Sequence, residues 1–159
     1  MVGNISTISI YNQFTTATLT NMPAKIWMGI TTQPDLSANW IPSTDMTLVF
    51  DGTVNFPAGQ NTITFPLQVP FAYTGGNLVV MFNRPMDTGY YSSLDHFKTD
   101  TSTNTNRARN MFSDSVTYDP AAPTGGTLTG IVPMTTLTMT PMTGDLYSWS
   151  TPPRITSVM

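Results

Sequence analysis

Apolar residues recur at every second position in several parts of this chain, and this alternation restricts the fold more than any other feature. Residues 25–30 carry isoleucine or methionine at alternate positions, with Lys25, Trp27 and Gly29 between them, and residues 63–69 repeat the pattern. A period of two places successive side chains on opposite faces of a strand, one of which lies on a core. No window shows helical periodicity without an interrupting proline or β-branched run. The sequence predicts strands and almost no helix.

Glycine and proline punctuate the chain between the strand-like segments. There are 13 prolines and 11 glycines in 159 residues, a length that suits one domain with a sizeable core. Short strands at regular spacing with such turns predict an all-β, antiparallel β-sandwich with a jelly-roll-like arrangement. We predict one sandwich domain over residues 1–140, with residues 141–159 as a final strand or a linker-like tail.

Asp51-Gly52 is the strongest local turn signal. Strand-like residues 47–50 and 53–56 flank it, and both of its positions tolerate a positive φ, so we predict a tight two-residue hairpin there. Further along, the unbroken apolar run of residues 77–82 predicts a strand that is buried on both faces at the centre of a sheet.

Two segments lack strand-forming hydrophobic residues. Residues 90–110 are polar and predict a long surface loop, and residues 118–126, rich in proline and glycine, predict a second loop. The proline-containing stretch 150–154 is typical of a linker or an extended last segment.

Threonine, serine and asparagine supply most of the polarity, since charged residues make up only 9% of the chain. The net charge is −3 and the six Lys and Arg residues are scattered, which argues against a nucleic-acid partner. No apolar run approaches the length of a membrane span, and the start of the chain has no signal-peptide pattern. A hydroxyl-rich, weakly charged surface predicts an extracellular or cell-surface module whose signal peptide is not in this chain.

The inventory of catalytic side chains is small. His96 is the only histidine, no Gly-x-Ser-x-Gly turn is present, and all nine acidic residues are aspartates, most of them in turn-like contexts. Zinc is excluded because cysteine and histidine together total one residue. The sequence therefore predicts no catalytic residues and no enzymatic activity.

Calcium is the one cofactor that the sequence leaves open. Loop aspartates with nearby carbonyl groups can supply the oxygen ligands that calcium requires, and the candidates are Asp95, Asp114 and Asp119. These residues do not follow a contiguous calcium-loop spacing.

Aromatic side chains supply the candidate ligand-binding residues. Trp27, Tyr90, Tyr91 and Trp149 are rings that a carbohydrate-binding module presents as a stacking surface. Trp27 alternates with core positions, so its face is either solvent-exposed, covered by a second layer or a binding surface. Trp40 is better explained as a plug at the end of the core.

A set of short motifs runs through the chain: Trp40-Ile41-Pro42, residues 46–54, Pro70-Phe71-Ala72-Tyr73, residues 76–80, residues 106–109, Ser113-Asp114-Ser115 and residues 123–128. This succession resembles a β-sandwich module of large secreted surface proteins in Bacteroidetes-type bacteria, which often lies beside fibronectin type III or adhesin-like domains. The resemblance covers about residues 5–137 and implies an extracellular, non-catalytic role, but it supplies no binding residues.

Two functional classes follow. The first is a module of a multidomain surface protein that acts in adhesion or as a structural spacer, with neighbouring domains and surface proteins as partners. The alternative is a carbohydrate-binding module that binds glycans through exposed rings. Self-association into an extracellular structural assembly is a weaker alternative.

Overall fold

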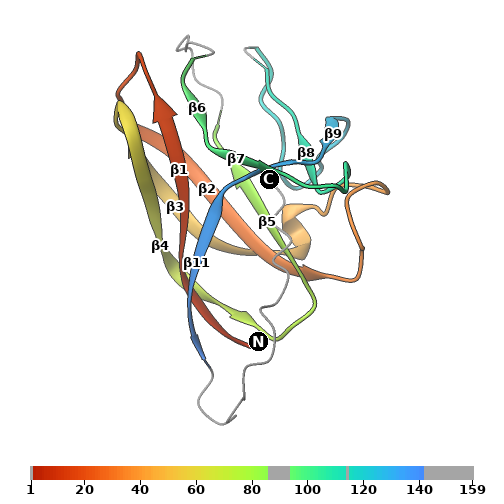
Figure 1. Ribbon diagram of the computed structural model, residues 1–159. Helices are drawn as coiled ribbons and strands as arrows, with labels where there is room; N and C mark the ends of the chain where they lie inside the picture. The colour runs from red at the N-terminus through yellow and green to blue at the C-terminus, as the bar shows by residue number, and fades with distance from the viewer. Residues whose placement is uncertain (1, 86–93, 114, 142–159) are drawn as a thin grey trace.

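The computed structural model describes residues 2–85, 94–113 and 115–141 and consists almost entirely of antiparallel β-strands (Figure 1). Within these residues the helical content is a single 3-10 turn, η1 (Ser43–Asp45). The predicted all-β fold is confirmed. The strands are β1 (Gly3–Phe14), β2 (Leu19–Thr31), β3 (Thr47–Phe56), β4 (Gly59–Tyr73), β5 (Asn77–Asn83), β6 (His96–Phe97), β7 (Thr99–Thr101), β8 (Ala108–Asn110), β9 (Thr127–Thr129), β10 (Ile131–Pro133) and β11 (Thr135–Pro141).

Two sheets pack face to face as a sandwich. The four-stranded sheet has the order β11-β1-β4, with the short β6 paired to the end of β1, and the three-stranded sheet has the order β3-β2-β5. Two small antiparallel pairs, β7 with β10 and β8 with β9, complete the described strands. The final strand β11 pairs with β1 along its length, so the sandwich extends to Pro141. Residues 142–159 of the predicted tail lie outside the described residues.

The main core lies between the two sheets, and Phe65 occupies its interior. The Phe65 ring packs edge-on against Phe50 at 5.3 Å and against Phe82 at 5.7 Å between centroids. Removing these apolar side chains from water is the dominant stabilising term. The buried members are Ile5, Ile8, Ile10, Phe14, Met22, Ala24, Ile26, Met28, Val49, Phe50, Phe56, Ile63, Phe65, Leu67, Phe71, Leu78 and Val80.

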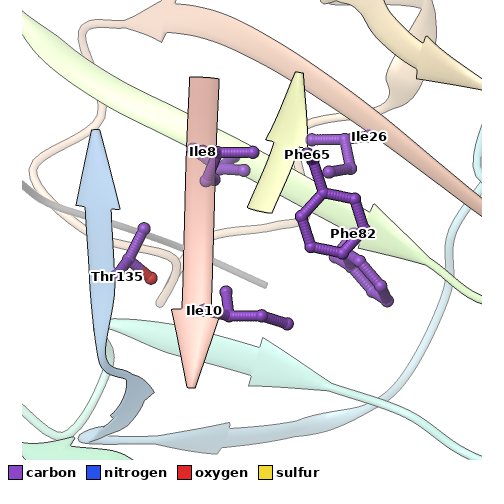
Figure 2. A pocket seen from close by; sticks show the side chains of 7 residues that line it. Ile8, Ile10, Ile26, Phe65, Phe82 and Thr135 are labelled. Atoms are coloured by element: carbon purple, nitrogen blue, oxygen red, sulfur yellow. The ribbon is translucent and has the colours of Figure 1, made fainter. Parts of the chain in front are cut away.

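A narrow apolar slot remains between the sheets (Figure 2). Its free volume is about 10 Å³, enough for no more than one water molecule, so it is a packing gap and not a ligand pocket. Side chains from β1, β2, β4, β5 and β11 line it: Ile8, Ile10, Ile26, Phe65, Val80, Phe82 and Thr135.

The predicted Asp51-Gly52 hairpin is wrong, because β3 runs without a break through both residues. Gly52 lacks the positive φ that such a turn requires, and the Phe50 ring packs where its side chain would be. The Gln68 side chain donates to the Asp51 carbonyl at 3.0 Å and accepts from its amide at 2.9 Å, as a neighbouring strand would. The reversal falls at Pro57-Ala58 instead, where Gly59 has a φ of 90°.

The strand predicted from residues 77–82 is confirmed as buried on both faces, but its predicted central position is wrong. β5 pairs only with β2 within the described sheet, and β2 is central. The outer face of β5 is buried because residues 32–46 fold over it. Val79 there packs with Leu36 and Ile41 in a second, small core that Met46 and Leu128 border.

Two further expectations need correction. Val69 was predicted to continue the core pattern of β4, but 49% of it is exposed. Between the register pairs Ile5–Phe71 and Thr7–Pro66, β4 bulges away from β1, and Phe71 resumes the pattern.

The segment 90–110 was predicted to be a loop, yet β6, β7 and β8 form within residues 94–110 because they pair with strands distant in sequence.

No helix in the described part of the chain has the length and apolar character needed to cross a membrane.

Candidate functional site

The outer face of the three-stranded sheet is covered along only part of its length. Gly29 and Val79 are register partners on this face, and the segment 32–46, which we call the cover, lies over them. A β-carbon at Gly29 would lie 3.0 Å from the Met46 side chain, which shows how closely the cover packs. The covered part therefore offers no binding surface.

The face is partly open at Trp27, where its β5 partner Met81 is still buried but its β3 partner Leu48 is exposed. Leu48 on β3 and Met81 on β5 flank Trp27 in the register, and in the next row Asp51 and Asn83 flank Lys25. Trp27 and Asn83 are half-buried, whereas 39% of Leu48 is exposed. We call the surface formed by Trp27, Leu48, Lys25, Asp51 and Asn83 the Trp27 ledge.

The polar row of the Trp27 ledge is accessible and close to neutral. The Lys25 ammonium lies 2.9 Å from the Asp51 carboxylate, and these side chains are 41% and 47% exposed. An exposed ion pair of this kind contributes little to folding. The row thus presents an ammonium group, a carboxylate and the Asn83 amide beside an aromatic ring, a combination that donates and accepts hydrogen bonds next to an apolar surface.

Sequence reasoning placed Trp27 and Lys25 on one face of a strand, and the structure confirms this. It did not find Leu48, Asp51 or Asn83, because cross-strand register brings them to Trp27 from separate parts of the chain. For Asp51 the turn-forming signal of Asp-Gly pointed to a different role.

Trp40 holds the cover of the small core in place. Its indole nitrogen donates to the Gly125 carbonyl at 2.8 Å, and the Arg109 guanidinium lies 6.0 Å from its ring. Arg109 also donates to the carbonyls of Gly125 and Leu36, both at 3.1 Å. Trp40 is therefore a structural residue, as its sequence context favoured.

Among the calcium candidates, Asp95 and Asp119 accept hydrogen bonds from backbone amides. Asp95 accepts hydrogen bonds from the amides of Thr15 and Thr16, at 2.6 and 2.9 Å, and so fixes the turn between β1 and β2. Asp119 accepts from the Ala121 amide at 2.9 Å. Hydrogen bonds from Thr16, its side chain first, lower the pKa of Asp95.

Several predicted site residues cannot be placed. Asp114, Tyr90, Tyr91 and Trp149 lie outside the described residues. Within residues 2–85, 94–113 and 115–141, no three histidine or acidic side chains gather into a group that would hold a metal ion.

Asp35 fixes another loop. Its carboxylate accepts hydrogen bonds from the Ser37 amide at 2.9 Å and from the Asn104 side chain at 3.2 Å. Hydrogen bonding, from Ser37 first, lowers the pKa of Asp35 to about 2.

The free energy of unfolding will therefore fall as the pH drops from about 4 towards 2. Asp35 has a lower pKa in the folded chain than the ordinary 3.8, so the unfolded chain binds the proton more readily. The stabilisation is present above pH 4 and is lost as Asp35 protonates. Urea unfolding at a series of pH values, with wild type and Asp35→Asn, measures this slope. Identical acid slopes in the two proteins would contradict the assignment.

Three of the exposed apolar side chains belong to the segment before β6 and to the loop that follows β8. Phe112 is 88% exposed, Leu94 60% and Val116 51%. Figure 1 places the start of β6 and the loop that follows β8 at the end opposite the N-terminus, which we call the distal end.

Comparisons of the chain with protein-family models, with curated proteins and with solved structures find no match.

Proposed function

We propose that this chain is a non-catalytic adhesion module of a larger extracellular or cell-surface protein. The observation that carries this proposal is the pairing of Gly3 with Pro141 between β1 and β11. The start of β1 and the end of β11 thus lie at the same end of the sandwich. This arrangement leaves the opposite, distal end free of both strand ends, which suits a module that presents its distal end to a partner.

Two further features support an adhesive role. The segments at the distal end, the start of β6 and the loop that follows β8, include or adjoin the exposed Leu94, Phe112 and Val116. The outer face of the four-stranded sheet is rich in exposed hydroxyls, among them Thr136, whose hydroxyl lies 2.7 Å from that of Tyr11, and such a neutral polar surface suits an extracellular setting. The resemblance of residues 5–137 to surface-protein modules of Bacteroidetes-type bacteria agrees with this setting.

Oriented attachment tests the proposal, because the chain contains no cysteine. One set of beads carries the protein through a cysteine placed before Gly3, and a second set carries it through Ala58→Cys, in the turn between β3 and β4 near the distal end. We expect the first set to adhere to mucin-coated or collagen-coated plates under flow and the second set to adhere several-fold less. Equal adhesion by the two sets, or adhesion by neither, would overturn the proposal.

Carbohydrate binding is the second candidate function, and the Trp27 ledge is the observation that favours it. Trp27 lies partly exposed beside a row of hydrogen-bonding side chains, which is the composition of a sugar-binding surface. Calcium remains a proposal without a defined ligand set.

A further inference from the structure

The open part of the three-stranded sheet lies on the distal side of the segment 32–46 that covers Gly29 and Val79. β1 runs from Gly3 to the distal end, and β2 returns from the turn at residues 15–18, so the early residues of β2 are the distal ones. Lys25 and Trp27 precede Gly29, where the cover of residues 32–46 begins. The Trp27 ledge therefore lies near the middle of β2, on the distal side of the cover.

The ledge joins two kinds of group in adjacent rows. Trp27 and Leu48 supply an apolar surface, and Asp51, Lys25 and Asn83 supply hydrogen-bond acceptors and donors one row away, about 7 Å along the strands. A sugar ring has the matching chemistry, since one face is lined by C–H groups and its rim by vicinal hydroxyls. A planar carboxylate or amide can bond two such hydroxyls at once.

The charge of the ledge narrows the ligand class. One ammonium and one carboxylate lie 2.9 Å apart and offset each other, so the ledge attracts neither strongly acidic nor strongly basic partners. Trp27 is half-buried and Leu48 is the one exposed aliphatic side chain beside it, so the apolar surface is smaller than the desolvated centre that a protein hot spot requires. A neutral ligand with both apolar and hydroxyl-bearing edges fits best.

We propose that the Trp27 ledge binds neutral glycans, with the sugar ring stacked on Trp27 and its vicinal hydroxyls bonded by Asp51 and Asn83. This inference rests on the proposed adhesive function, for which it names the partner class. The Lys25 ammonium orients the Asp51 carboxylate and offers a further donor to the sugar.

A printed glycan array, with insoluble chitin, xylan and cellulose pulldowns, tests the inference. Trp27→Ala will weaken binding at least about tenfold, because stacking and ring burial are lost together. Asp51→Asn and Asn83→Ala will each weaken it about 3- to 10-fold through lost hydrogen bonds. Tyr11→Ala, the same kind of change on the central strand of the opposite sheet, will leave binding unchanged, as will Asp100→Asn.

The two polar substitutions keep the test decisive if Trp27→Ala fails to fold, since both change exposed or half-exposed side chains. Binding of no glycan, or equal glycan binding by wild type, Asp51→Asn and Asn83→Ala, would overturn the inference. Mucin oxidised with periodate separates the two proposals. Adhesion that survives oxidation and survives Trp27→Ala leaves the adhesive function standing with a protein partner, whereas no adhesion to intact mucin or collagen rejects the adhesive function itself.

Discussion

Phe65→Ala will lower the free energy of unfolding by about 3–5 kcal/mol, the range for a large aromatic side chain removed from a core. Phe65 is 1% exposed, and its ring contacts Phe50 and Phe82 from the facing sheet. It also lines the existing slot between the sheets, so truncation enlarges a gap that the backbone has already left unfilled. Equilibrium urea unfolding followed by tryptophan fluorescence gives the measurement.

Phe112→Ala is the matched control for this prediction. The same atoms are removed from a side chain that is 88% exposed, so the expected change lies within about 0.5 kcal/mol. Similar losses in the two variants would mean that Phe65 does not occupy the interior of a packed sandwich.

Gly126→Ala will destabilise the cover of the small core by about 2–4 kcal/mol, the sum of a left-handed backbone and a steric clash. Gly126 has a φ of 84°, and a β-carbon there would lie 2.8 Å from the Asn110 carbonyl oxygen and 3.0 Å from the Trp40 ring. A carbonyl of the backbone cannot move aside cheaply, so the loop must shift and loosen the contacts of Trp40 and Arg109.

Gly125→Ala separates the two causes. Gly125 also has a positive φ, 72°, but a β-carbon there meets nothing within 4 Å. Its substitution will cost only the backbone term, about 1 kcal/mol. Equal losses at the two neighbouring glycines would show that the close approach to Trp40 and Asn110 has no energetic weight.

The strands that carry a strict alternation could be read from the sequence. In β2, Ile26 and Met28 are buried and Trp27 lies on the opposite face, as the period of two predicts, but Ile30, predicted to lie on the core face with them, is 42% exposed at the end of the strand. The same pattern gave the buried positions Ile63, Phe65 and Leu67 of β4 and failed at Val69, where a bulge interrupts the pairing with β1. A bulge depends on the pairing with the partner strand, so the sequence of one strand alone does not predict it.

The candidate site, too, could be predicted only in part from the sequence. Trp27 was recognised because an aromatic ring on the non-core face of a strand is visible in a local pattern. Asp51 was assigned to a turn because Asp-Gly is a strong turn signal, whereas strand pairing with Lys25 and hydrogen bonds from Gln68 hold it in an extended strand. These partners are 26 and 17 residues away along the chain, so no local signal distinguishes the two outcomes.

By itself, the sequence determined that this chain forms antiparallel strands around an apolar core, because periodicity, β-branched residues and turn-forming residues act over a few neighbouring positions. Tertiary structure alone decided which strand became central, where β3 continued through Asp51-Gly52, and which part of the outer face the segment 32–46 covers. Those outcomes depend on pairings between distant segments, whose free energies are comparable with the local preferences that they override. The Trp27 ledge also depends on tertiary structure, since it is exposed only where the cover of residues 32–46 ends.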